Sequence, residues 1–198
     1  MESVPKSKFS SSEARATWQA TAQLPTAWFQ WITVSTSPKS FQLNVQLKWE
    51  VTRDPLHRDI DINKPCGVGT GMSFANSVKS RLGVIGRVPC ARGGSSIKEW
   101  EKGDKHYENM IKRAKAIVKV GGVGGDIKTL LWYQGENDTF NLNDVENYKR
   151  RLEKLVQNVR TDLNMHFLPI LQVIIESVDG PLKDEVIKQQ KALSCLML

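Results

Sequence analysis

The chain has 198 residues, 40% of them hydrophobic and 25% charged, which is enough for one domain with a core and short for two. No apolar run reaches the roughly 18 residues that span a bilayer, so no membrane partner is expected. The opening residues MESVPKSKFSSSEA lack the apolar stretch of a secretory signal, which favours an intracellular location. The net charge of +7 comes from scattered basic residues without a nucleic-acid-binding motif, so no nucleic-acid partner is expected either.

The amino-terminal fifth differs in composition from the rest. All 14 glycines lie at or after Gly67, whereas four of the six tryptophans lie within the first 49 residues. The three cysteines, Cys66, Cys90 and Cys195, are an odd number without metal-ligand spacing, so a reduced chain without metal or cofactor is expected. Residues 1–36 show neither a helical period nor sustained alternation, and we expect them to be a poorly ordered segment foreign to the rest.

The regular elements begin after this segment. Strict alternation of apolar and polar residues from Phe41 to Trp49 predicts one half-buried strand. We expect helices over 72–82, 107–118, 143–159 and 181–193, and strands over 84–88, 127–133 and 168–175. Asn143 and Glu146 suggest a capping box at the third helix, and Gly121-Gly122 ends the second. This alternation predicts an α/β fold with a parallel sheet covered by helices on both faces.

Two loops stand out, because function in open α/β sheets lies at the carboxyl ends of the strands. Residues 89–100 read PCARGGSSIKEW, and residues 132–138 read WYQGEND. Taken singly, the first holds a glycine turn and the second is a polar loop. Taken together, they can converge on one pocket in which a glycine N–H and an amide side chain form an oxyanion hole.

Seven sequence blocks in register carry a family resemblance. They are LKWE at 47–50, DPLH at 54–57, CGVG at 66–69, VPCA at 88–91, GGS at 93–95, IKEW at 97–100 and WYQGE at 132–136. In them the chain resembles the plant carbohydrate esterase, sialate O-acetylesterase-like family of SGNH hydrolases (carbohydrate esterase family six), from about Ser37 to about Leu193. The resemblance implies a three-layer, flavodoxin-like fold and serine-dependent removal of acetyl groups from sugars.

The resemblance also assigns site residues by position. The family builds its oxyanion hole from a glycine of the Gly-Gly-Ser loop and a polar side chain of the Gln-Gly-Glu loop. These roles fall to Gly94, Gln134 and Asn137. Substrate contacts fall to the neighbouring residues Gly93, Ser95, Gly135 and Glu136.

The chain lacks the two motifs that carry the family's catalytic residues. The family's nucleophile lies in a Gly-Gln-Ser-Asn-Met motif after the first strand, and its Asp and His lie in an Asp-x-x-His motif near the carboxyl end. The first motif does not occur here, and the chain reaches Leu198 without the second. Asp54 to His57 spells Asp-x-x-His, but it falls where the family carries its own Pro-Leu-His and is expected to be a decoy. We therefore expect residues 37–198 to be a partial esterase domain, altered in its first strand and inactive.

A shifted reading frame can account for the missing motif. Glu13 to Trp18 can be encoded GAG GCC AGA GCA ACA TGG. Reading from the last base of the first codon gives GGC CAG AGC AAC ATG, which encodes Gly-Gln-Ser-Asn-Met. Our hypothesis is that residues near 9–36 are an out-of-frame translation, with the family's frame resuming near Ser37.

Two other functions stay open. The chain can be a non-catalytic module that binds sugars through Trp100, Trp132 and Glu136. The run from Gly67 to Gly71 invites a dinucleotide-binding interpretation, but no strong strand precedes it, and a lone glycine cluster argues weakly.

Overall fold

A six-stranded sheet forms the centre of the protein. The computed structural model describes residues 28–35, 40–53, 55–63, 70–119, 126–175 and 180–193, with 28–35, 118 and 119 described by backbone alone. The strands follow the spatial order β3-β2-β4-β1-β5-β6. Their bounds are β1 (Trp28–Ser35), β2 (Phe41–Leu43), β3 (Trp49–Val51), β4 (Val84–Pro89), β5 (Ile127–Tyr133) and β6 (Ile170–Val173).

Strand β1 lies inside the sheet and runs against both of its neighbours. Gln30 pairs with Pro89 and Ser35 with Val84 of β4, while Trp28 pairs with Tyr133 of β5. Residues 28–35 therefore form a strand within the segment that the sequence analysis expects to be poorly ordered, and this strand adds two antiparallel ladders to the predicted parallel sheet. Their sequence, WFQWITVS, is rich in aromatic and β-branched residues that favour strands, and an antiparallel ladder occupies both open edges. The remainder of the 1–36 segment lies outside the described residues.

The predicted strand from Phe41 to Trp49 is instead a hairpin. β2 and β3 pair antiparallel, with Phe41 opposite Val51 and Leu43 opposite Trp49. Asn44 closes the turn, since its side-chain Oδ1 accepts the N–H of Lys48 at 2.9 Å and its backbone oxygen accepts that of Leu47 at 3.1 Å. Local side-chain-to-backbone bonding of this kind favours a turn over a continuous strand. β2 also pairs parallel with β4, as β5 does with β6.

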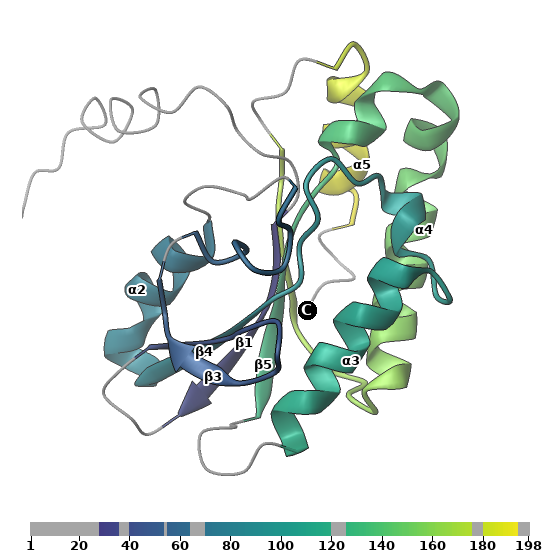
Figure 1. Ribbon diagram of the computed structural model, residues 1–198. Helices are drawn as coiled ribbons and strands as arrows, with labels where there is room; N and C mark the ends of the chain where they lie inside the picture. The colour runs from purple at the N-terminus through teal and green to yellow at the C-terminus, as the bar shows by residue number, and fades with distance from the viewer. Residues whose placement is uncertain are drawn as a thin grey trace, which may run out of the picture.

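Helices cover both faces of the sheet, which confirms the predicted three layers (Figure 1). Helices α3 (Lys105–Lys119), α4 (Leu142–Asp162) and α5 (Lys183–Lys191) lie on one face, and α2 (Thr70–Leu82) lies on the other. Two short 3₁₀ turns, η1 (Ile97–Trp100) and η2 (Glu136–Phe140), follow β4 and β5. Helix α4 is capped by Asn141 rather than Asn143, because the Asn141 Oδ1 accepts the N–H of Asn143 at 2.9 Å.

The main core lies between the sheet and α3 to α5. The predicted apolar stripe of α4 is buried in it, as are the indole rings of Trp100 and Trp132. A smaller cluster of Ala75, Ile85 and Leu131 lies beneath α2. Cys90 is buried, and its thiol donates to the backbone oxygen of Val88 at 3.4 Å. The other two cysteines, Gly67-Val68-Gly69 and Gly121-Gly122 lie outside the described residues. In the described part of the chain, no helix has the length and apolarity needed to cross a membrane.

Candidate active site

The two loops that the sequence singled out are in contact at the carboxyl ends of β4 and β5. The Gln134 Nε2 donates to the backbone oxygen of Ser95 at 3.1 Å. The backbone N–H of Ile97 donates to both carboxylate oxygens of Asp138, at 3.1 and 3.0 Å. The two loops are therefore in contact with each other, although β1 separates β4 from β5.

Three carboxylates fix the backbone of the glycine loop, residues 93–97. Asp61 Oδ2 accepts the N–H of Gly93 at 2.7 Å, Glu99 Oε2 accepts that of Ser96 at 2.7 Å, and Asp138 accepts that of Ile97. Hydrogen bonds to charged acceptors are stronger than neutral ones, so each carboxylate holds one point of the loop. Between the first two points, Gly94 takes a φ of 74°, in the left-handed region that glycine enters without strain.

The side chain of Gln134 packs against the glycine loop inside the protein and does not face the solvent. Its side chain is fully buried, and its amide nitrogen donates to the Asp138 carboxylate as well as to Ser95. Its backbone oxygen accepts hydrogen bonds from the Tyr148 hydroxyl at 2.9 Å and from Gln190 Nε2 at 2.7 Å. Both hydrogens of the Gln134 amide therefore already have acceptors within the protein.

Asp138 is a buried carboxyl group at the centre of this network. Burial is the largest influence on it and raises its pKa to about 7, while the hydrogen bonds from Gln134 and Ile97 act in the opposite direction. Of the nearby charges, Asp144 raises this pKa and Arg151 lowers it. The group that anchors the glycine loop therefore gains or loses its proton near neutral pH.

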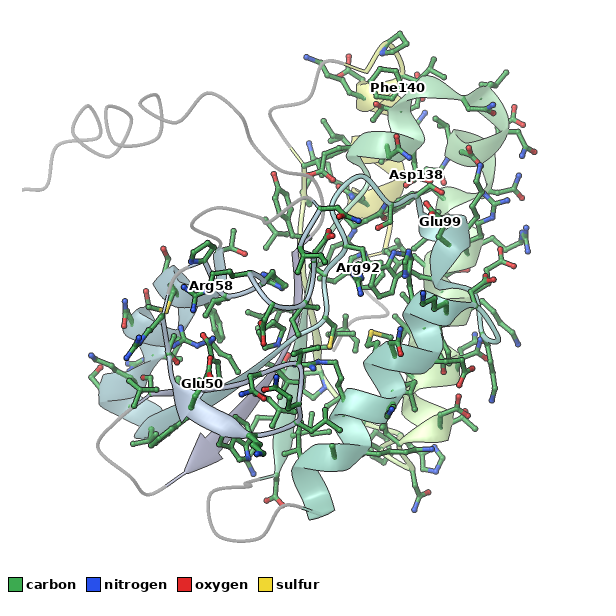
Figure 2. All side chains as sticks on the ribbon, in the orientation of Figure 1. Glu50, Arg58, Arg92, Glu99, Asp138 and Phe140 are labelled. Carbon is green, nitrogen blue, oxygen red and sulfur yellow. The ribbon has the colours of Figure 1, made fainter. Side chains whose placement is uncertain are left out.

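A cavity of about 330 Å³, called here the loop cavity, opens in front of the glycine loop. Figure 2 shows Arg92 and Glu99 of this region, with Asp138 nearby on η2. Within the cavity, Arg92 pairs with Asp61 at 3.5 Å, and His106 Nε2 lies 3.9 Å from Glu99. Burial lowers the pKa of His106. The lining residues are Asp61, Asn63, Arg92, Gly93, Gly94, Ser95, Glu99, Lys105 and His106.

The predicted site residues divide into two groups. Gly93, Gly94 and Ser95 line the loop cavity. Gln134, Gly135 and Glu136 are buried, and Asn137 is exposed on η2; none of these four is among the residues that line the cavity. The structure thus brings the two loops into contact but presents only the first loop to the cavity.

The serines beside the glycines have other partners. The Ser95 hydroxyl donates to the Arg92 backbone oxygen at 2.9 Å and accepts the indole N–H of Trp100 at 3.0 Å. The Ser96 hydroxyl donates to Glu99 at 3.2 Å. These contacts agree with the loop and capping roles predicted for both serines. His57 is fully buried, and Asp54 lies outside the described residues.

The alternative of a non-catalytic sugar-binding module depends on Trp100, Trp132 and Glu136. All three side chains are buried, and the two indole rings pack edge to face with centroids 5.9 Å apart. A ring enclosed in the core presents no face on which a sugar can stack. The two tryptophans belong to the packing between the sheet and the helices.

The sequence reasoning missed two residues of this site, Asp61 and Asp138. Asp138 directly follows Asn137 in the loop, but the family resemblance assigns no role to it. Asp61 lies in a polar connection without a motif of its own. Among the described residues, no group of three or more His, Cys, Asp or Glu could hold a metal ion.

Comparison with known proteins decides the family. The sequence profile described as "Carbohydrate esterase, sialic acid-specific acetylesterase" matches residues 20–197. The chain belongs to this family. A probable carbohydrate esterase of Arabidopsis thaliana is 51% identical over 143 residues, which are 70% of this chain and 54% of that protein.

Two solved structures agree with the family's fold. An Arabidopsis thaliana protein matches with a TM-score of 0.74 and 47% identity over 80% of this chain and 65% of its own. A carbohydrate acetylesterase from Xanthomonas citri matches with a TM-score of 0.55 and 19% identity over 83% of this chain and 40% of its own, a likeness of fold. The chain spans about half the length of its curated Arabidopsis relative.

Proposed function

We propose that this chain carries the oxyanion side of a carbohydrate esterase site without a working nucleophile and base, and that it hydrolyses acetyl esters far more slowly than an intact family member. In an intact member, a serine assisted by histidine attacks the acetyl carbon, and backbone or amide donors stabilise the negative oxygen that develops. In this proposal, residues 37–198 are the partial esterase domain. Gly94, which lines the loop cavity, is the surviving donor.

The direction of β1 is the observation that carries the proposal. In a parallel sheet, the residue after the first strand reaches the same edge as the loops that follow β4 and β5. Here Ser35 pairs with Val84 at the start of β4, so the chain leaves β1 at the opposite edge. A nucleophile placed directly after β1 would therefore lie a strand's length from the glycine loop.

The hydrogen bonds of the site add support. The Ser95 hydroxyl is engaged with Arg92 and Trp100, and that of Ser96 with Glu99, so neither is directed at His106. His106 itself faces Glu99 and lies against Trp100, with ring centroids 5.2 Å apart. A serine needs a hydrogen bond to its base before it becomes nucleophilic.

Hydrolysis of p-nitrophenyl acetate and of an acetylated xylo-oligosaccharide by the purified chain tests the proposal. We expect initial rates equal to those of the Ser95→Ala and His106→Ala variants and close to that of buffer. Saturable turnover abolished by either substitution would overturn the proposal and identify the missing group. Saturable turnover that survives both would also overturn it, and would place the nucleophile elsewhere in the chain.

A further inference from the structure

A second cavity adjoins the loop cavity and differs from it in charge. It encloses about 260 Å³ between the β2–β3 hairpin and α3, and is called here the hairpin cavity. Arg92 and His106 line both cavities, so the two are neighbours. The remaining lining residues are Val45, Leu47, Ile60, Cys90, Asn109, Met110, Lys112 and Arg113.

Arg113 gives the hairpin cavity a buried positive charge. The residue is 7% exposed, and its guanidinium donates to the backbone oxygens of Pro89 at 2.8 Å, Asn44 at 3.0 Å and Leu43 at 2.5 Å. Buried arginines are usually paired with an acid, but these acceptors are neutral, and Arg113 forms no ion pair with a described residue. A guanidinium has five N–H donors, so three acceptors do not exhaust it.

The other charged residues around the hairpin cavity do not cancel its positive charge. Lys112 is exposed at the rim and likewise forms no ion pair with a described residue, whereas Arg92 is paired with Asp61. Within the part of the chain that the structure describes, no acidic side chain lines the hairpin cavity. Two carboxylates lie beside lining residues: Asp59 accepts the N–H of Val45 at 2.6 Å, and Asp61 accepts that of Gly93 and balances Arg92. One negative charge at Asp59 therefore faces two positive charges, Lys112 and Arg113, that have no ion-pair partner among the described residues.

The apolar part of the lining indicates the kind of anion. Val45, Leu47, Ile60 and Met110 present hydrocarbon surface, which suits a carbon skeleton better than a fully hydrated inorganic ion. We propose that the hairpin cavity binds a small organic monocarboxylate, with its carboxylate facing Lys112 and Arg113 and its carbon skeleton against the hairpin. The bound molecule lies next to the glycine loop through the shared residues Arg92 and His106. This inference concerns binding and holds whether or not the chain hydrolyses esters.

Titration of the full chain with matched small molecules tests the proposal. Glucuronate and butyrate supply the carboxylate, glucose is the neutral partner of glucuronate, and inorganic phosphate is the control anion. Calorimetry at low salt is expected to give saturable binding of both carboxylates with Kd on the order of 1 mM, and none of glucose. Raising the salt to about 0.5 M weakens binding because the Lys112 contribution is screened.

Substitutions on α3 locate the site. Lys112→Gln is expected to weaken glucuronate binding by about fivefold, while Lys115→Gln, an exposed lysine on the same helix, leaves it unchanged. In the unsubstituted chain, amide NMR shifts on adding glucuronate are expected at Asn109 and Lys112 and in the hairpin turn. Absence of saturable binding, equal binding of glucose, tighter binding of phosphate, or equal loss in both lysine variants would each overturn the proposal.

Discussion

Gln134 donates its side-chain amide to the backbone oxygen of Ser95 across 3.1 Å, although the two residues are 39 positions apart and follow strands that are not neighbours. The bond joins the loop after β5 to the loop after β4, and β1 lies between these two strands. Because the same amide also donates to Asp138, which holds Ile97, Gln134 is attached to the glycine loop at two points. The buried amide thus acts on the site by positioning it.

Replacing Gln134 with alanine is expected to destabilise the fold. The substitution leaves the Ser95 oxygen and the Asp138 carboxylate without their amide donor in a buried place, at a cost of about 1–3 kcal/mol for each unsatisfied group. Urea unfolding followed by tryptophan fluorescence measures the change. Gln157→Ala, at an exposed position of α4, is the control and should change the free energy of unfolding by less than about 0.5 kcal/mol. Equal stability of the two variants would show that the amide bridge contributes nothing.

The raised pKa of Asp138 predicts how stability changes with pH. The unfolded carboxyl group loses its proton near pH 3.8, and the folded one near pH 7 because burial disfavours its charge. Between these values the folded protein keeps a proton that the unfolded chain has released. The stability due to this group is therefore fully present below about pH 3.8 and is lost as the pH rises through 7, with an upper limit of about 4 kcal/mol.

Comparison with Asp138→Asn isolates that contribution, because asparagine does not ionise. His106 acts in the opposite direction, since burial lowers its pKa and its charging as the pH falls opposes folding. We therefore expect the original chain to lose stability relative to the variant as the pH rises from 5 to 8. A difference that stays constant over this range would exclude titration of Asp138 in the folded state.

Gly135 and Gly103 form a matched pair for testing the packing behind the site. Both have a positive φ, 140° and 100°, so alanine adds backbone strain of about 1–2 kcal/mol at either. At Gly103 a new Cβ would meet nothing within 4 Å, but at Gly135 it would lie 2.9 Å from Gln190 Nε2 and 3.2 Å from Val186 Cγ1. Gly135→Ala should therefore lower the urea midpoint clearly more than Gly103→Ala. Equal midpoints would mean that α5 moves aside without cost.

The sequence predicted those parts of the fold that have a strong period. The stripe of α4 and the run of β5 are of this kind, because burial of one helix face or of a whole strand leaves a regular apolar pattern. The hairpin at Asn44 was missed because its turn keeps the alternation of the strands on either side. The antiparallel position of β1 between β4 and β5 was missed. The direction in which a strand pairs depends on which neighbouring strands have unpaired backbone groups, and the sequence of β1 alone does not contain this information. Within the site, Gly94 was found from a motif, whereas the anchoring role of Asp138 depends on a contact 41 residues away.

The coding nucleotides give a direct test of the origin of the amino-terminal segment. If residues near 9–36 are an out-of-frame translation, the codons for Glu13 to Trp18 must read GAG GCC AGA GCA ACA TGG. Only this set of codons encodes Gly-Gln-Ser-Asn-Met when it is read from the last base of the first codon. Most of these amino acids have several codons, so a sequence unrelated to the motif would rarely use all of the required ones. Sequencing the transcript is expected to find this run, followed by a return to the family's frame near Ser37. Any other codons for Ala14 to Thr17 that break the shifted motif would end the frame-shift hypothesis. The reversed strand β1 would then be an inherited feature of this chain rather than the product of a changed reading frame.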